Sequence, residues 1–294
     1  MLTRRLLPLV LAFSLLTSCG PPRRDRIVVG SKNFTEQLVL GEIIAQQIEN
    51  RTHLPVDRRF YLAGTYICHQ AMLSGRIDIY PEYTGTALTA ILKLPANSKD
   101  PQQVYETVKH EYQSSFGLVL GPTLGFNNTF AIEIRGEDAR KLHLKTISDA
   151  VPYASHWRAG FGYEFMERPD GFKGLASTYG LKFAENPRIM DLGLLARALK
   201  ERQIDLGAGN TTDGLIPALD LFVLEDDKHY FPPYEAVPII RQETLFSHPE
   251  LVQALAGLTG KISDQEMREL NYEVDSKHRD TRQVAAEFLR SKSL

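Results

Sequence analysis

Residues 80–86 combine an aromatic ring and a hydroxyl group at the end of an apolar strand pattern, where a helix pattern begins. Thr86 would lie near the N-terminus of that helix, a place where backbone N–H groups favour an anion. Tyr83 offers an aromatic face, and Lys32 supplies a cation at an equivalent place after the first strand pattern. These residues could hold a small charged ligand. Aromatic residues at such spacings also fill hydrophobic cores, so spacing alone leaves both interpretations open.

The chain lacks the residue patterns that usually mark catalysis or metal binding. It contains no Gly-x-Ser-x-Gly turn, no Gly-Lys-Ser/Thr phosphate loop and no His-Glu-x-x-His motif. The eight histidines are scattered without the spacing of metal ligands. We therefore expect a protein that is not an enzyme and that uses no metal ion and no cofactor.

Short apolar runs alternate with helix patterns along the chain, which indicates an α/β fold. Strands are predicted at 27–30, 56–61, 77–80, 129–134 and 204–206, and helices at 65–73 and 192–200. Asn33 and Glu36 have the spacing of a capping box for the helix that carries Leu40, Ile44 and Ile48 on one face. The last fifty residues read as helical, with a capping start at 263–266.

Two segments that are 127 residues apart resemble each other. Residues 71–79 and 198–206 both read as a helix end, a turn and a strand of apolar-Asp-apolar type. Tyr83 and Asn210 then occupy matching places after the two strands. Such a similarity between two segments can arise by chance in α/β chains. If it is meaningful, two lobes each present a similar loop at the carboxyl end of a strand, where α/β proteins bind ligands.

The first residues predict export and a lipid anchor. Arg4 and Arg5 precede an 11-residue apolar run at 6–16, which is too short to span a bilayer and fits a signal peptide. The run ends in Leu-Thr-Ser before Cys19, which resembles the lipobox of bacterial lipoproteins. We expect a signal peptide at 1–18, lipidation of Cys19 and a tether at 19–25. Cys68 is then alone and is expected to be a small buried apolar residue.

Residues 26–294 are enough for two compact domains. Without Arg4 and Arg5 the basic count falls from 34 to 32 against 36 acidic residues, so the formal charge is about −4. A nucleic-acid partner would require a basic face, and this composition argues against one.

Six motifs, in order along the chain, resemble the glycine betaine/carnitine/choline-binding proteins of osmoprotectant ABC importers. The motifs are residues 30–37 (GSKNFTEQ), 78–86 (DIYPEYTGT), 125–130 (GFNNTF), 167–171 (ERPDG), 212–214 (TDG) and 226–234 (DDKHYFPPY). The resemblance covers essentially all of 26–294. It implies a type II periplasmic-binding-protein fold, with two α/β lobes joined by two crossover strands that act as a hinge. The implied limits are 26–124 and 235–294 for lobe one and 125–234 for lobe two.

The resemblance also implies a pocket for a quaternary ammonium group. A trimethylammonium group has a positive charge but no N–H to donate, so aromatic faces suit it. Tyr83 and Tyr234 match cage positions, while Lys32, Thr86 and Arg168 match positions that contact a ligand carboxylate. Two positions depart from the family pattern. Phe130 and Asn210 stand where relatives that bind glycine betaine usually have tyrosine.

The resemblance finally implies a monomer that delivers its ligand to the permease and ATPase of an ABC importer. We expect this monomer outside the cytoplasm, lipid-anchored in the periplasm or on the outer face of the cytoplasmic membrane. Lys32, Arg168 and Thr86 together favour a zwitterion such as glycine betaine, with carnitine, choline and ergothioneine as alternatives. Two other functions stay open at this point: a sensor or adaptor that signals to a protein partner, and an enzyme on a similar scaffold.

Overall fold

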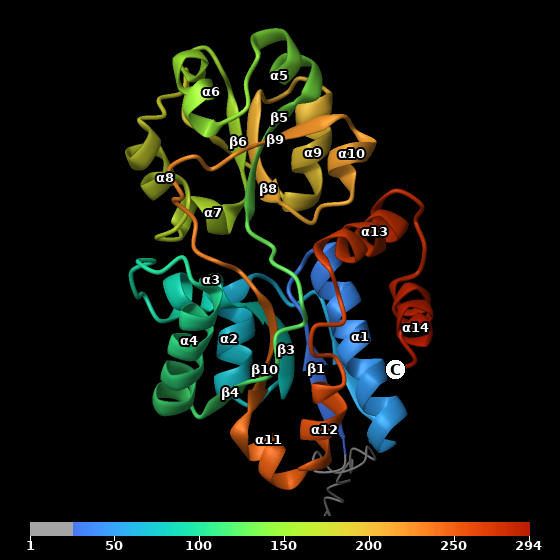
Figure 1. Cartoon of the computed structure of the whole chain (residues 1–294). Coiled ribbons are helices and arrows are strands. Elements are labelled where there is room, and N and C mark those ends of the chain that lie inside the picture. The colour runs from blue at the N-terminus through green and yellow to red at the C-terminus, as the bar shows by residue number, and fades with distance from the viewer. Residues whose placement is uncertain (1–25) are drawn as a thin grey trace, which may run out of the picture.

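The computed structural model describes residues 26–294, which form two lobes joined by two connections (Figure 1). The predicted signal peptide at 1–18, the lipidated Cys19 and the tether at 19–25 lie outside the described residues. The two lobes each contain a five-stranded sheet. Among residues 26–294, no helix is long and apolar enough to cross a membrane.

Lobe one has a sheet of strand order β2-β1-β3-β10-β4. Strand β1 is buried along its whole apolar length, as expected for a parallel strand covered on both faces. The strands are β1 (Ile27–Gly30), β2 (Val56–Arg59), β3 (Ile79–Tyr83), β4 (Leu118–Leu120) and β10 (Ala236–Arg241). The helices are α1 (Thr35–Thr52), α2 (Thr65–Leu73), α3 (Thr84–Thr86), α4 (Pro101–Phe116), α11 (Gln242–Ser247), α12 (Glu250–Ala256), α13 (Asp264–Asp275) and α14 (Thr281–Ser291), and α3 runs into a π-helical turn, Ala87–Ile91.

Lobe two has a sheet of strand order β7-β6-β8-β5-β9. Its strands are β5 (Phe130–Arg135), β6 (Ala159–Phe161), β7 (Arg188–Ile189), β8 (Leu206–Asn210) and β9 (Leu221–Leu224). Its helices are α5 (Gly136–Leu142), α6 (Ile147–Ala154), α7 (Tyr163–Glu167), α8 (Phe172–Tyr179), α9 (Leu192–Lys200) and α10 (Leu215–Ala218). The two-lobed α/β fold inferred from the sequence is confirmed by this architecture.

The repeated apolar-Asp-apolar segment has a structural explanation. Strands β3 and β8 both occupy the middle of their sheets, beside β1 and β6 respectively. Asp78 Oδ2 accepts a hydrogen bond from Val28 N at 2.9 Å, and Asp205 Oδ2 accepts one from Arg158 N at 3.0 Å. Each aspartate therefore caps the start of the neighbouring strand. Tyr83 and Asn210, the last residues of β3 and β8, both face the space between the lobes.

Two antiparallel connections link the lobes, at 121–129 and 225–235. They run side by side, because Asn128 N donates to Tyr234 O at 3.0 Å and Ala236 N donates to Phe126 O at 3.2 Å. The green and orange segments between the lobes in Figure 1 are these connections. The predicted lobe limits after residues 124 and 234 fall within them.

Most predicted elements occur within two residues of their expected ends, but one cap is wrong. Helices α2 and α9 have the predicted bounds, and α13 begins at the capping box of Ser263 and Glu266. Helix α1, however, has Phe34 as its N-cap with no side-chain hydrogen bond, so Asn33 does not cap it. Glu36 is occupied by distant partners instead, as described below. Residues 81–83, which follow the strand predicted at 77–80, also belong to β3.

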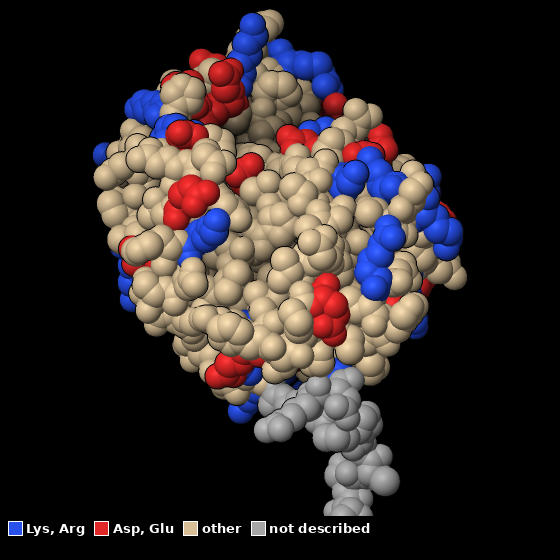
Figure 2. Space-filling model, turned by 60° about the horizontal axis from the view of Figure 1, so that its bottom comes forward, with Lys and Arg blue, Asp and Glu red and all other residues tan. Residues whose placement is uncertain are grey.

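The lone cysteine of the described residues is buried, as predicted. Cys68 lies on α2 within the lobe-one core, and its burial raises the pKa of the thiol to about 12. On the face shown in Figure 2, basic and acidic side chains of the described residues are interspersed with uncharged surface, without a continuous basic area.

Candidate functional site

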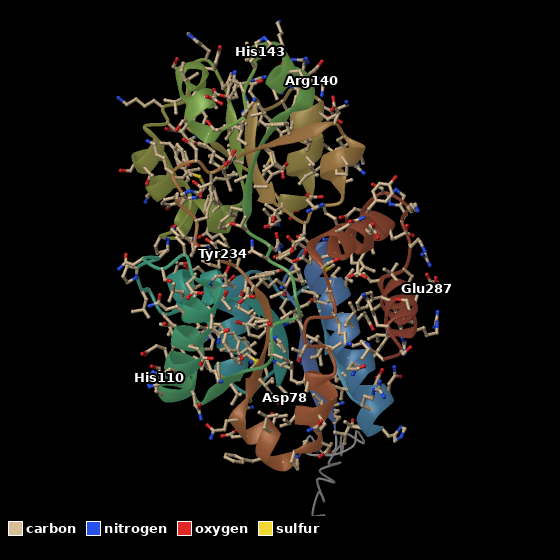
Figure 3. All side chains as sticks on the ribbon, viewed as in Figure 1. Asp78, His110, Arg140, His143, Tyr234 and Glu287 are labelled. Atoms are coloured by element: carbon tan, nitrogen blue, oxygen red, sulfur yellow. The ribbon has the colours of Figure 1, made fainter. Side chains whose placement is uncertain are left out.

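A cavity of about 540 Å³ between the lobes brings the predicted site residues together. Lobe one, lobe two and the second connection all contribute to its wall, and Tyr234 lies at the junction of the lobes in Figure 3. The seven side chains predicted to bind ligand all line this cavity: Lys32, Tyr83, Thr86, Phe130, Arg168, Asn210 and Tyr234. Their convergence is a structural finding, whereas their contact with a ligand stays a prediction.

Aromatic rings from separate parts of the chain line this cavity. Phe130 and Tyr234 meet edge to face, with ring centroids 5.7 Å apart. Phe165, which the sequence analysis did not single out, packs on Phe130 with centroids 4.7 Å apart and also lines the cavity. Tyr83 joins from the end of β3. Ring faces carry negative electrostatic potential. Lys32 Nζ lies 5.2 Å from the centre of the Tyr83 ring, and the Arg168 guanidinium lies 4.9 Å and 6.0 Å from the centres of the Phe130 and Tyr234 rings.

Arg168 belongs to lobe two and contacts lobe one, and its positive charge is already paired with a carboxylate. Its guanidinium is 5% exposed and forms a two-point ion pair with Asp170, Nε to Oδ1 at 2.9 Å and Nη2 to Oδ2 at 2.5 Å. The remaining Nη1 donates across the cleft to Thr86 Oγ1 at 3.1 Å. Burial opposes ionisation of Asp170, but the charge and hydrogen bonds of Arg168 hold the pKa of that carboxyl below its usual value. The guanidinium also lies 4.9 Å from the centre of the Phe130 ring.

Lys32 has a similar arrangement within lobe one. Its ammonium group, 3% exposed, forms an ion pair with the buried carboxylate of Glu82. Glu82 also accepts hydrogen bonds from the Tyr80 hydroxyl at 3.1 Å and from Tyr83 N at 2.8 Å. Each of the two predicted carboxylate-binding cations is therefore matched by one buried carboxylate, and the two pairs add no net charge to the cavity.

Both tyrosines of the predicted cage donate their hydroxyl groups to buried carboxylates. Tyr83 Oη donates to Glu36 Oε1 at 2.6 Å, and Tyr234 Oη donates to Asp170 Oδ2 at 2.5 Å. Hydrogen bonds to charged acceptors are stronger than neutral ones and fix the ring orientation. A phenol that donates to a carboxylate also keeps more electron density in its ring, which favours a cation above the ring face.

Glu36 holds four segments of the chain together, a role that the sequence did not reveal. Besides Tyr83, its carboxylate accepts from Asn128 Nδ2 at 2.7 Å, Thr212 Oγ1 at 2.5 Å and Asn271 Nδ2 at 3.0 Å. Thr212 belongs to lobe two and Asn128 to the first connection, so this carboxylate links the lobes. Burial raises the pKa of Glu36, and the four hydrogen bonds oppose that shift. Among the described residues, no ion pair is formed with it.

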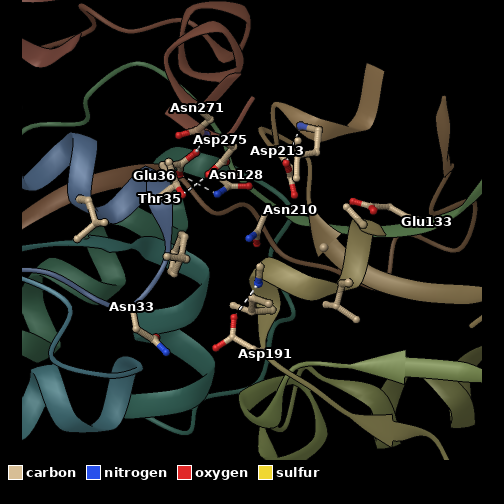
Figure 4. Close-up of a pocket in the computed structure, with 18 of the residues that line it drawn as sticks. Asn33, Thr35, Glu36, Asn128, Glu133, Asp191, Asn210, Asp213, Asn271 and Asp275 are labelled. Carbon is tan, nitrogen blue, oxygen red and sulfur yellow. Dashed lines mark hydrogen bonds between the residues drawn. The ribbon is translucent and has the colours of Figure 1, made fainter. Parts of the chain in front are cut away.

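A second, smaller cavity of about 160 Å³ adjoins the first and is acidic (Figure 4). Carboxylates from both lobes line it, and none of its lining residues is Lys, Arg or His. The acidic residues are Glu36, Glu133, Asp191, Asp213 and Asp275. Burial, reinforced by the nearby charges of Asp275 and Glu36, raises the pKa of Asp213 to about 6. Among residues 26–294, no three His, Cys, Asp or Glu side chains are grouped closely enough to hold a metal ion.

Comparison with known proteins gives one consistent family. A family profile described as the substrate binding domain of ABC-type glycine betaine transport system matches residues 25–291. The chain is 38% identical to the carnitine transport binding protein OpuCC of Listeria monocytogenes, over 96% of this chain and 93% of the relative. It is also 38% identical, over 90% of its length, to the ergothioneine transport permease/ergothioneine binding protein EgtU of Helicobacter pylori, and spans 47% of that longer protein.

A solved structure supports the same assignment. The crystal structure of a glycine betaine/carnitine/choline ABC transporter protein is 35% identical to this chain, with a TM-score of 0.75. The match covers 91% of this chain and 98% of that chain.

Proposed function

The chain belongs to the family of substrate-binding domains of ABC-type glycine betaine transport systems, and on this premise we propose how its cleft holds a ligand. It is the substrate-binding component of an ABC importer of the glycine betaine, carnitine and ergothioneine type. We propose that the ligand carries a trimethylammonium group, with glycine betaine first and with carnitine, choline and ergothioneine as alternatives. One observation carries the proposal: aromatic rings and two paired cations from both lobes line one cavity.

The trimethylammonium group lies against the rings of Tyr83, Phe130 and Tyr234 in this proposal. Burying a quaternary cation against carboxylates alone would leave those carboxylates without hydrogen bonds, because the cation has no N–H group to donate. An aromatic face provides negative potential without that loss, and contributes about 0.5–2 kcal/mol per ring. The hydroxyl bonds of Tyr83 and Tyr234 to carboxylates support this role.

The ligand carboxylate lies on the side of Lys32, Arg168 and Thr86. Thr86 Oγ1 accepts a hydrogen bond from Arg168, so its own proton is left to donate to a ligand. Since Lys32 and Arg168 are each paired with a carboxylate, the ligand shares these cations with Glu82 and Asp170. That charge balance favours a ligand of zero net charge over a free anion. A zwitterion is also favoured over choline, because choline has no carboxylate to accept hydrogen bonds from Lys32, Arg168 and Thr86.

We further propose where the protein acts and with which partners. The signal peptide at 1–18 directs export, and lipidation of Cys19 holds the protein in the periplasm or on the outer face of the cytoplasmic membrane. The monomer then presents its closed lobes to the permease of an ABC importer, whose ATPase drives uptake. The protein releases its ligand chemically unchanged.

Titration calorimetry with a shape-matched control tests the ligand class. Glycine betaine, carnitine, choline and ergothioneine are titrated beside 3,3-dimethylbutanoate, which has the shape of glycine betaine but a carbon atom in place of the nitrogen. We expect saturable heat with the zwitterions, weaker binding of choline and little binding of the carbon isostere. Equal affinity for glycine betaine and its isostere would show that the rings do not recognise the cation. No heat with any quaternary ligand would refute the ligand class while leaving the fold intact.

A further inference from the structure

The motif at 212–214 lies where the two lobes meet and not in the ligand cavity. It follows β8 of lobe two, and none of its three residues lines the cavity of about 540 Å³. Thr212 is nevertheless completely buried. In Figure 1, helix α10, which follows this motif, and helix α13 of lobe one lie on the same side of the molecule. The motif therefore has a role in how lobe two meets lobe one.

Helix α13 of lobe one provides hydrogen-bond donors for this segment. Asn271 Nδ2 donates to Thr212 O at 2.9 Å, and Arg268 Nε donates to Thr211 O at 3.1 Å. Residues that are three apart lie on the same face of a helix, so both donors come from one face of α13. Two successive carbonyl groups of lobe two are thereby bound to one helix of lobe one.

The glycine of the motif has a steric explanation. A Cβ atom at Gly214 would lie 2.4 Å from Tyr272 N and 2.6 Å from Tyr272 Cα, much closer than a van der Waals contact. These are backbone atoms of α13, which cannot move aside as the end of a flexible side chain can. Only glycine lets the loop approach α13 this closely.

The buried carboxylate of Glu36 completes the contact from inside lobe one. Its Oε2 accepts hydrogen bonds from Thr212 Oγ1 at 2.5 Å and from Asn271 Nδ2 at 3.0 Å. Its other two donors belong to lobe one and to the first connection, so Thr212 is its one donor from lobe two among the described residues. Separation of the lobes removes this charge-assisted hydrogen bond, which is stronger than a neutral one.

We propose that residues 211–214 and α13 form an interlobe latch, in which Thr212 and Asn271 are positioning residues that hold lobe two closed over the ligand. The inference rests on the function proposed above and concerns how the same cleft retains its ligand. The bond between Arg168 and Thr86 also joins the lobes, but both of those side chains face the ligand cavity. Thr212 does not, so it acts on affinity through the population of closed lobes. The latch should therefore act mainly on the rate of ligand release.

Thr212→Val tests the latch, because it removes the hydroxyl donor and keeps the shape of the side chain. We expect the Kd for glycine betaine to rise about 10- to 100-fold, which corresponds to one hydrogen bond to a charged group. We expect the release rate, measured by stopped-flow fluorescence of the tyrosines in the cavity, to rise by the same factor. Thr212→Ser restores the hydroxyl and should retain the original Kd and release rate.

Thr244→Val is the matched control. Thr244 also donates to a carboxylate, that of Asp78 at 3.2 Å, but both of these residues belong to lobe one. This variant should lose stability in thermal melting and retain the Kd and the release rate. A purely structural role for Thr212 would give the same pattern in Thr212→Val and would overturn the latch.

A second variant keeps the test valid if Thr212→Val does not fold. Arg268 is only half-buried, and Arg268→Met removes one donor of the latch. We expect ligand release from this variant to be about 2- to 10-fold faster, because one hydrogen bond is lost.

Two results with glycine betaine would overturn the latch: unchanged release from the latch variants that fold, or a higher Kd without faster release. If no quaternary ligand binds the unsubstituted protein, the proposed function is refuted instead. The latch is then judged by small-angle X-ray scattering of the ligand-free protein. A larger radius of gyration for the latch variants than for Thr244→Val would support it, and equal radii would overturn it.

Discussion

The ring and the hydroxyl group of Tyr83 have separable roles, and two substitutions distinguish them. Tyr83→Phe keeps the aromatic face and removes the donor to Glu36, whereas Tyr83→Leu removes both. A hydrogen bond to a charged group contributes about 1.5–3 kcal/mol. Tyr83→Phe should therefore lose stability by that amount, which lowers the melting temperature by about 3–10 °C for a chain of this size. Tyr83→Leu should lose more, because it also removes a buried ring.

Only the leucine variant should lose the cation–π interaction. One ring contributes about 0.5–2 kcal/mol, which corresponds to about a 2- to 30-fold weaker Kd for glycine betaine. Thermal melting gives the stability of each variant, and titration calorimetry gives its Kd. Tyr112→Phe is the control, because Tyr112 is buried in lobe one and its hydroxyl has no partner among the described residues. Equal Kd values for Tyr83→Phe and Tyr83→Leu would refute the reasoning, since the ring face would then make no contribution.

Three further predictions concern Arg168, Asp213 and Cys19. Arg168→Gln leaves the buried Asp170 without its ionic partner, so we expect about 3–5 kcal/mol lower stability in urea unfolding and a loss of glycine betaine binding; a change below about 1 kcal/mol would contradict the pairing. Burial raises the pKa of Asp213 from 3.8 to about 6, so the folded state favours the protonated carboxyl. The free energy of unfolding should therefore fall as the pH rises from about 4 through about 6. Asp213→Asn should flatten that part of the urea-midpoint profile, and an unchanged slope would argue against this assignment. Cys19→Ala should move the protein from the membrane fraction to the soluble fraction, while retention of the variant in the membrane would contradict lipid anchoring.

Sequence patterns predict which residues line the cavity where those residues lie at the ends of strands. Tyr83 and Asn210 end the central strands β3 and β8, and the carboxyl ends of such strands in two facing lobes open toward one cleft. Phe130, Arg168 and Tyr234 were predicted through motifs, because the spacing of the two aromatic residues alone is more typical of core residues. Phe165 was missed for the same reason, although it precedes Arg168 on the chain.

Contacts between distant parts of the chain could not be predicted. Asn33 and Glu36 have the local spacing of a capping box, yet Glu36 bonds to Thr212 and Asn271, which lie 176 and 235 residues further along. Four buried hydrogen bonds outweigh one cap at a helix end. The pairing of Lys32 with Glu82 is similar, since nothing in the sequence says that the two side chains face each other. The acidic cavity depends entirely on how the lobes meet.

A crystal structure with glycine betaine bound tests the central claim most directly. The account predicts the ligand nitrogen within about 6 Å of the ring centres of Tyr83, Phe130 and Tyr234, with the carboxylate toward Lys32, Arg168 and Thr86. A ligand bound with its trimethylammonium group away from these rings, or outside the cleft between the lobes, would contradict it.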